Sequence, residues 1–476
     1  MKIFYIAAEA SPFIKTGGLA DVAGSLPKAL AKNDQEVSVV LPLYSAIDWK
    51  YRSQFEFVGY FYVDLDWRHQ YVGVFKYEKD DVNYYFIDNE YYFARNSLYG
   101  EIDDGERFIF FNRAVVGLLK YLDIKPDIVH ANDWHTGLIP LYLKDYSKGD
   151  SFYKDIKSVY TIHNIKYQGI FKSDILSIAG LGGQYYNEEG IKYYDCINMM
   201  KAGIVYCDLL TTVSHTYAQE IRYSFFGQGL DGIIRKHQHK LKGIINGIDY
   251  DIFNPKTDKT IDYNYDAKDF SQKKKNKAEL QRLFHLPENP DVPLIGMVTR
   301  LVDLKGIDLL DYVMDELMNE DIQLVVLGTG ENNYEDMLKY YSYRYKNKLA
   351  AGIYFDEAHS KKIYAGADFF LMPSVAEPCG ISQLIAMRYG TIPIVRETGG
   401  LSDTVIPYNK YTNEGTGFGF KTINAHEMLY AIKKAIKLYQ DKDSFNKLIK
   451  RDLELDNSWN KSSIEYLEEY KRITNG

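Results

Sequence analysis

The chain alternates short apolar runs with longer segments in which apolar residues recur at helical spacing, and it does so once in each half. Short apolar runs bounded by turn residues predict buried parallel strands, and the segments between them predict helices. The predicted strands are Lys2–Ala8, Glu36–Leu41, Asp127–His130, Ser158–Ile162 and Lys242–Ile245, then Pro293–Val298, Leu324–Gly328, Gly352–Phe355, Phe369–Met372 and Ile392–Val395. Two doubly wound α/β domains of similar size are therefore predicted.

Three runs in the first half follow a different pattern. Residues 58–63, 71–75 and 82–87 alternate or are rich in tyrosine, phenylalanine and valine, which predicts antiparallel strands inserted into the first domain.

The domain boundary is expected where a strand ends and a polar, charged segment, 256–277, follows. We expect a first domain at 1–245 and a second at 246–456. Residues 457–476 are amphipathic through Ile464, Leu467 and Tyr470 and predict a helix that can pack back on the first domain.

Composition narrows the class of protein. The 476 residues are 46% hydrophobic, enough for a core in each domain, and the formal net charge of -8 argues against a general nucleic-acid or membrane binder. The three cysteines are scattered, and no apolar run approaches the roughly 18 residues of a membrane span. We expect a cytoplasmic protein without a membrane or nucleic-acid partner.

The most informative stretch is 374–383, between a predicted strand and a predicted helix. Pro378 suits the first turn of a helix, which would place the Glu377 carboxylate beside the N–H groups of Cys379, Gly380 and Ile381. Helix N-terminal N–H groups favour an anion. A carboxylate beside an anion cradle suits a ligand with hydroxyls at one end and phosphate at the other, such as a sugar nucleotide.

Each domain also has a lysine where a strand passes into a helix. Lys15 precedes the glycine turn at 17–18, and Lys305 precedes Gly306, with Arg300 just ahead of it. A lysine at a helix N-terminus is unfavourable unless an anion shares the site. We therefore expect a diphosphate in a cleft between the two domains.

Other candidate motifs carry less weight. His135 and His163 follow predicted strands, where an open sheet places its site, but a single histidine there is usually structural. Residues 227–232 match a dinucleotide fingerprint, yet the preceding segment looks helical, so we reject a nicotinamide site. The D-x-D pairs at 64–66 and 249–251 are common patterns, and we expect no metal site.

Several of these motifs occur together and in order in one family. Lys15–Val22, His130–His135, Thr161–Asn164, Arg300–Gly306, Glu377–Gly380 and Thr398–Thr404 make the whole chain resemble the glycogen and starch synthases. The resemblance implies the GT-B arrangement, in which two Rossmann-like domains face an interdomain cleft. It implies transfer of glucose from ADP-glucose to the non-reducing end of an α-1,4-glucan, with retention of configuration and no cofactor besides the donor.

The resemblance also implies roles for particular residues. The group placed at the reacting sugar and diphosphate comprises Glu377, His163, Arg300 and Lys305. The donor side comprises Lys15, Gly18, Asn246, Phe355, Cys379, Gly380, Ile381 and Ser382, with Phe355 against the adenine and several residues acting through backbone N–H groups. The acceptor or sugar side comprises Asp21, Asp133 and Asn164.

Retention by double displacement needs two opposed carboxylates, and the family pattern offers no such pair. We therefore expect attack on the same face as the departing diphosphate, which Arg300 and Lys305 would stabilise. Two alternatives stay open: a related transferase that uses UDP-glucose or a small acceptor, and a catalytically silent glucan-binding protein.

Overall fold

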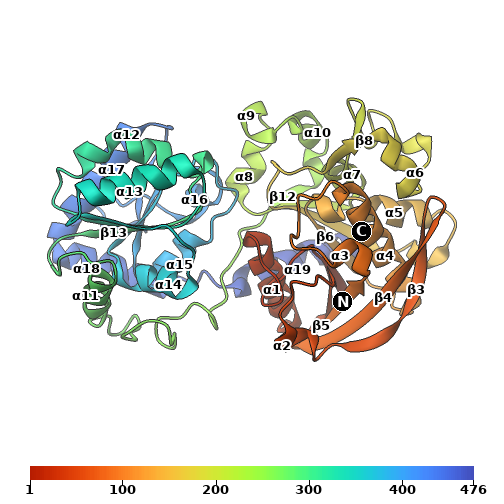
Figure 1. The fold of residues 1–476 in the computed structure, drawn as a ribbon, viewed down its shortest axis with the longest axis horizontal. Helices are drawn as coiled ribbons and strands as arrows, with labels where there is room; N and C mark the ends of the chain where they lie inside the picture. Colours follow the sequence, from red (N-terminus) through yellow and green to blue (C-terminus); the bar gives the residue numbers. More distant parts are fainter. Residues whose placement is uncertain (476) are drawn as a thin grey trace. The chain divides into compact units, whose positions relative to one another are not determined.

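The computed structural model describes residues 1–475, which divide into two compact units. Unit 1 contains residues 1–246 and the C-terminal helix α19 (Trp459–Asn475), and unit 2 contains residues 247–458. Both are α/β units with one extended sheet each, as the alternation of apolar runs predicted (Figure 1).

The sheet of unit 1 is parallel except at one edge. Its strand order is β12 (Leu241–Gly243), β11 (Leu209–Thr212), β7 (Lys157–Ile162), β6 (Ile128–Asn132), β1 (Lys2–Ile6), β2 (Glu36–Pro42), β5 (Val82–Asp88), β4 (Arg68–Lys79) and β3 (Glu56–Leu65). β4 runs antiparallel to both β3 and β5, whereas β5 pairs with β2 in parallel. The inserted antiparallel hairpin therefore consists of β3 and β4. The third strand expected in this insert, β5, is antiparallel to β4 but pairs in parallel with β2, so the expectation was wrong for that pairing.

Helices connect these strands. The longer ones are α1 (Gly18–Ala31), α4 (Asp104–Tyr121), α5 (Ile139–Tyr146) and α7 (Met199–Tyr206). Short elements complete the unit: α2 (Trp49–Arg52), α3 (Glu90–Phe93), α6 (Leu176–Ala179), α8 (His215–Glu220), α9 (Ser224–Gly227), α10 (Asp231–Lys236), and the small sheet of β8 (Ile170–Lys172), β10 (Cys196–Asn198) and β9 (Lys192–Tyr193).

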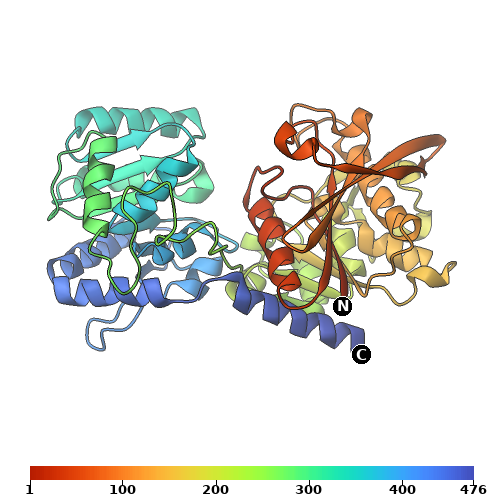
Figure 2. The ribbon, with the colours of Figure 1, turned by 90° about the horizontal axis from the view of Figure 1, so that it is seen from below.

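Helix α19 packs beside α1, although the two lie at opposite ends of the sequence (Figure 2). The Tyr470 hydroxyl lies 2.6 Å from Nδ1 of His130 on β6, and Asn33 donates to the Ser463 hydroxyl. The C-terminal helix therefore belongs to the core of unit 1.

Unit 2 is a fully parallel sheet with the order β15 (Leu349–Gly352), β14 (Gln323–Leu327), β13 (Leu294–Val298), β16 (Phe369–Met372), β17 (Ile392–Arg396) and β18 (Phe418–Phe420). Figure 1 shows α12 (Ile307–Leu317), α13 (Asn332–Arg344) and α17 (Ala425–Gln440) on one face and α11 (Lys273–Leu283), α14 (Glu357–Gly366), α15 (Ser382–Arg388) and α18 (Lys442–Glu454) on the other. Helix α16 (Gly399–Thr404) follows β17. Helices on both faces of a parallel sheet bury its strands on both sides.

Two predicted element boundaries in unit 2 were wrong. The strand expected at 352–355 ends at Gly352, so Phe355 lies in the loop beyond it. Helix α15 begins at Ser382, four residues after Pro378, so Pro378 does not occupy its first turn. The reason is a turn at Gly380, whose φ of 72° is accessible mainly to glycine and keeps 377–381 out of the helix.

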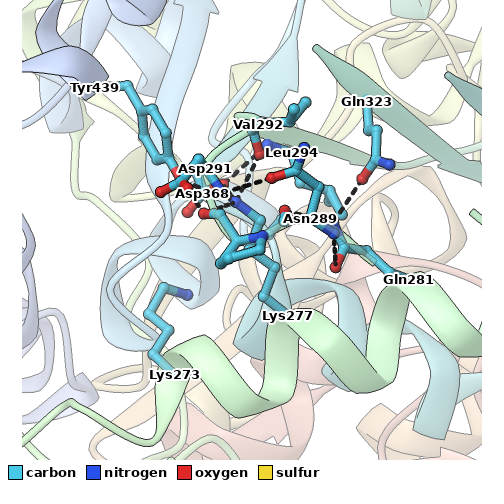
Figure 3. A network of polar contacts seen from close by, with 12 residues as sticks. Lys273, Lys277, Gln281, Asn289, Asp291, Val292, Leu294, Gln323, Asp368 and Tyr439 are labelled. Atoms are coloured by element: carbon cyan, nitrogen blue, oxygen red, sulfur yellow. Dashed lines mark hydrogen bonds and ion pairs between the residues drawn. The ribbon is translucent and has the colours of Figure 1, made fainter. Parts of the chain in front are cut away.

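The polar segment 256–277 is not a solvated linker. Lys277 on α11 is buried, and its ammonium lies 2.7 Å from the Asp368 carboxylate, 2.6 Å from the Val292 carbonyl and 2.9 Å from the Tyr439 hydroxyl (Figure 3). Asp368 also accepts from the backbone N–H of Leu294. A buried charge needs such partners, so α11 is fixed to the amino ends of β13 and β16.

Lys273, one helical turn earlier, is equally buried. Its ammonium donates to the Ala365 carbonyl at 2.9 Å and to the Thr391 hydroxyl at 2.6 Å, and burial lowers its pKa to about 7. The two lysines thus hold a helix of low hydrophobicity against the sheet.

Within the described residues, none of the helices combines the length and the apolar character needed to cross a bilayer.

Candidate active site

The candidate site residues of unit 2 follow the carboxyl ends of its strands. The strand order places β13 between β14 and β16, so connections leave in opposite directions at β13 and β16. Ligands of doubly wound sheets bind at such a switch point. Lys305 follows β13 and Glu377 follows β16, and the Lys305 ammonium lies 2.5 Å from Oε2 of Glu377.

The Glu377 carboxylate is held from a second direction. The Ser374 hydroxyl donates to the same Oε2 atom at 3.0 Å. The side chains of Glu377 and Lys305 are 11% and 21% exposed, so the pair is mostly shielded from water but reachable from one side. Lys305 and Glu377 also line one small cavity of about 50 Å³ with Gly380, Ile381 and Ser382.

The loop that carries Glu377 is packed against the start of α16. The backbone N–H of Gly400 donates to the carbonyls of Glu377 and Pro378, at 3.2 and 3.1 Å. A Cβ atom at Gly399 would lie 1.9 Å from the Glu377 carbonyl oxygen, which leaves room for glycine alone. Cys379 is buried, and its carbonyl accepts from the Gln383 side chain.

Arg300 and Phe355 lie at the same edge of the sheet. Arg300 follows β13, is exposed, and forms no side-chain hydrogen bond or ion pair within residues 1–475. Phe355 is 74% exposed in the loop that follows β15. The structure therefore brings Lys305, Glu377 and the 380–382 backbone together, with Arg300 and Phe355 presenting free side chains.

In unit 1, the loop after β1 is held by an ion pair and by hydrogen bonds to a buried carboxylate. The Lys15 ammonium lies 2.6 Å from the Asp21 carboxylate on α1, so the unfavourable position of this lysine is relieved within the chain. The buried Glu9 carboxylate accepts from the backbone N–H and the hydroxyl of Thr16, at 2.5 and 2.8 Å. These contacts fix the loop that leads to Gly18, the first residue of α1.

The loops after β6 and β7 meet at Asp133. Its buried carboxylate accepts from the backbone N–H groups of His163 at 2.8 Å and Asn164 at 3.3 Å. Burial, reinforced by the nearby Glu9 carboxylate, raises the pKa of Asp133 to about 7. The backbone φ of Asp133 is 55°, an uncommon value for a residue other than glycine, and such values are frequent at functional sites.

The His163 ring is neutral. Burial lowers its pKa to about 3, and its Nε2 atom lies 2.8 Å from Oδ1 of Asn132. That oxygen also accepts from the Tyr5 hydroxyl, so Nε2 of His163 carries the proton and donates it. Nδ1 is therefore the ring acceptor.

Asn246 is buried at the end of unit 1, and its Oδ1 atom has no hydrogen-bond partner within the described chain. His135 differs from His163. Its ring is buried against Tyr99, Phe108 and Trp134, which gives it a packing role.

The segment 227–232 begins at the last residue of α9 and runs into α10, so it does not come directly off a strand, in agreement with the rejection of a dinucleotide fingerprint.

Glu9 was not among the candidates predicted from the sequence, and Ser374, the first residue of the stretch 374–383, was assigned no role. Glu9 follows a predicted buried strand directly, and a carboxylate at a strand end was a signal that could have been weighed. The sequence did not indicate the contact of Ser374 with Glu377, because that contact depends on how the loop turns.

Two family models match separate parts of the chain. Residues 2–236 match the family model of the starch synthase catalytic domain, and residues 281–452 match that of glycosyl transferases group 1.

Relatives extend over the whole chain. The glycogen synthase of Finegoldia magna is 56% identical over 99% of this chain and 100% of its own length. The glycogen synthase of Clostridioides difficile is 50% identical over 99% of this chain and 100% of its own length.

Among solved structures, the catalytic domain of starch synthase IV from Arabidopsis thaliana, bound to ADP and acarbose, matches with a TM-score of 0.92 and 33% identity, covering 100% of this chain and 99% of that one. A sucrose-phosphate synthase from Thermosynechococcus elongatus matches at a TM-score of 0.63 and 16% identity, covering 100% of this chain and 99% of that one, which shows the shared fold alone. With the two doubly wound units and full-length relatives of this identity, the chain belongs to the glycogen and starch synthase family of GT-B glycosyltransferases.

Proposed function

We propose that the protein transfers glucose from ADP-glucose to the non-reducing end of an α-1,4-glucan with retention of anomeric configuration. The observation that carries this proposal is the Lys305–Glu377 pair at the β13–β16 switch point. Full-length relatives that are glycogen synthases support the reaction, and the ADP and acarbose bound to the Arabidopsis enzyme support the donor nucleotide and a glucan-like acceptor.

In unit 2, the exposed Arg300 guanidinium and the Lys305 ammonium would neutralise the diphosphate, with backbone N–H groups of Gly380, Ile381 and Ser382 completing the cradle. Glu377 would accept hydrogen bonds from glucose hydroxyls. Phe355 would stack on the adenine, a role that suits an aromatic ring with this much exposed area.

In unit 1, Lys15 and the Gly18 N–H would contribute to the diphosphate site. An incoming anion would share the Lys15 ammonium with Asp21, which now neutralises it. Asp21, Asp133, Asn164 and Asn246 would face the sugars.

His163 would lie against the reacting glucose. The neutral ring assigned above does not repel the positive charge that develops at the anomeric carbon in an oxocarbenium-like transition state.

Retention would proceed on one face of the sugar. Glu377 is occupied by the Lys305 ammonium and the Ser374 hydroxyl, which suits a binding role better than that of an attacking nucleophile. The C1–O bond to the diphosphate would break while the acceptor hydroxyl attacks from the same face and passes its proton to a phosphate oxygen. Trapping a glucosyl ester on Glu377 or Asp133 would refute this mechanism.

The test is transfer of labelled glucose to glycogen from ADP-glucose and from UDP-glucose. We expect transfer from ADP-glucose that falls at least about 100-fold in Glu377→Ala. Faster transfer from UDP-glucose would correct the donor. Inactivity with both donors, in a folded protein that binds glycogen, would replace catalysis with a glucan-binding role.

A further inference from the structure

Arg396 is a buried cation directly behind the loop that carries Glu377. It is the last residue of β17 and is 6% exposed. Its Nε donates to the Ser374 carbonyl at 2.7 Å, Nη2 donates to the Val375 carbonyl, and Nη1 donates to the Lys421 carbonyl at 3.2 Å. One guanidinium thus fixes two consecutive residues of the loop after β16 to the segment after β18.

Both residues that Arg396 holds lead to the candidate site. The Ser374 hydroxyl donates to Oε2 of Glu377. The Val375 N–H donates to the carbonyl of Leu304, the residue before Lys305, at 2.9 Å. Arg396 is therefore connected to the carboxylate through Ser374, whereas its connection through Val375 reaches only the backbone before Lys305 and not the ammonium.

The guanidinium is well suited to this task. It is planar, permanently charged, and offers five N–H donors in a rigid fork, whereas the lysine ammonium is a compact charge on a flexible stem. A lysine at 396 could satisfy part of this set of carbonyls but could not hold all of them in one plane.

We propose that Arg396 is a positioning residue that sets the orientation of Glu377 relative to Lys305, and thereby how well the donor glucose is held for reaction. The proposal rests on the proposed function, because it assigns Arg396 to the same site. Arg396 does not touch the sugar; it acts through Ser374 and Val375.

Unit 2 contains a matched control. Arg451 on α18 is partly buried and also donates to two loop carbonyls, those of Gly415 at 2.7 Å and Asn413 at 2.5 Å. That loop follows α16 and contains no candidate site residue. Arg451→Lys therefore removes a comparable clamp without reaching Glu377.

The experiment compares Arg396→Lys, Arg451→Lys, Glu377→Gln and the double variant Arg396→Lys/Glu377→Gln. For each we would measure kcat and KM for ADP-glucose, the Kd of ADP by calorimetry, and Tm. Arg396→Lys should lower kcat/KM about 10- to 100-fold, since small displacements of a catalytic group can cost that much. The Kd of ADP, which has no glucose, should change less than about threefold.

Two further results are expected. Arg451→Lys should lower Tm but leave kcat/KM within about twofold of wild type. In the Glu377→Gln background, Arg396→Lys should add less than about a threefold loss, because its effect depends on the Glu377 carboxylate. Should Arg396→Lys fail to fold, Ser374→Ala removes only the hydroxyl that reaches Glu377 and should itself lower kcat/KM about 3- to 10-fold.

Equal activity of Arg396→Lys and Arg451→Lys would overturn the inference, as would losses that multiply in the double variant or an unaffected Ser374→Ala. Those outcomes leave the proposed function intact. An inactive wild type would instead overturn the proposed function, and the positioning role with it.

Discussion

Replacing Glu377 by alanine tests the centre of the site. In the proposed complex, its carboxylate accepts two charge-assisted hydrogen bonds from glucose hydroxyls. Each such bond contributes about 1.5–3 kcal/mol, so the loss should be about 3–6 kcal/mol, or roughly 10²- to 10⁴-fold in kcat/KM. Glu377→Gln keeps a neutral acceptor, and its loss should be smaller, about 10- to 100-fold.

The effect on stability should be small by comparison. Both variants leave Lys305 without its carboxylate partner, but that lysine retains access to water, with 21% of its side chain exposed. A partly solvated ion pair contributes on the order of 1 kcal/mol or less. The folded fraction at assay temperature should therefore be unchanged.

The assay is initial-rate transfer of labelled glucose from ADP-glucose to glycogen, with Tm measured on the same samples. Glu454→Ala is the control, because its carboxylate lies on the exposed surface of α18 and pairs with Lys450 at 3.8 Å. A kcat/KM for Glu377→Ala within about threefold of wild type, less than about 0.7 kcal/mol, would refute the assigned role.

Three further predictions address other parts of the molecule. Lys277→Met should lower the free energy of unfolding, measured by urea titration, by about 3–5 kcal/mol, because it leaves the buried Asp368 carboxylate without its cation. Lys274→Met, at an exposed position of the same helix, is the control, and an equal urea midpoint for the two variants would contradict this prediction. Between about pH 4 and pH 7, Asp133 keeps a proton in the folded protein that the unfolded chain releases, so its contribution to stability is lost as pH rises through that range. Asp133→Asn should therefore flatten the decline of Tm with pH that the wild type shows. Parallel curves of Tm against pH for the two proteins would refute the raised pKa. Cys379→Ser should keep kcat/KM within about threefold of wild type, because residues 380–382 are proposed to bind the donor through their backbone N–H groups. Complete loss of activity in a folded variant would show that the thiol takes part.

Local pattern was sufficient for most strands. Buried strands such as β1, β13 and β16 are nearly continuous apolar runs, and their ends were placed within a few residues. Two strands of the extended sheets, β11 and β18, were not predicted, and two other predictions were shifted along the chain. Gly380 turns the chain at a positive φ and delays α15, and β15 ends at Gly352, which leaves Phe355 in a loop.

Long-range contacts could not be predicted in the same way. The lysines of α11 look like solvated surface charge in the sequence, but Lys273 and Lys277 find buried acceptors on β-strand ends that lie about a hundred residues further along the chain. Similarly, nothing in the sequence near Arg396 indicates that it holds Ser374 and Val375.

By itself the sequence determined the two α/β units, the strand ends that carry Lys15, Lys305 and Glu377, and the family, because these depend on local periodicity and on motifs in a fixed order. Only the tertiary structure decided which groups meet: Lys305 with Glu377, Asp133 with the His163 backbone, and Arg396 with the loop after β16. The physical reason is that hydrogen bonds and ion pairs form over about 3 Å between atoms, and only the packing of helices and strands brings residues distant in sequence to that separation.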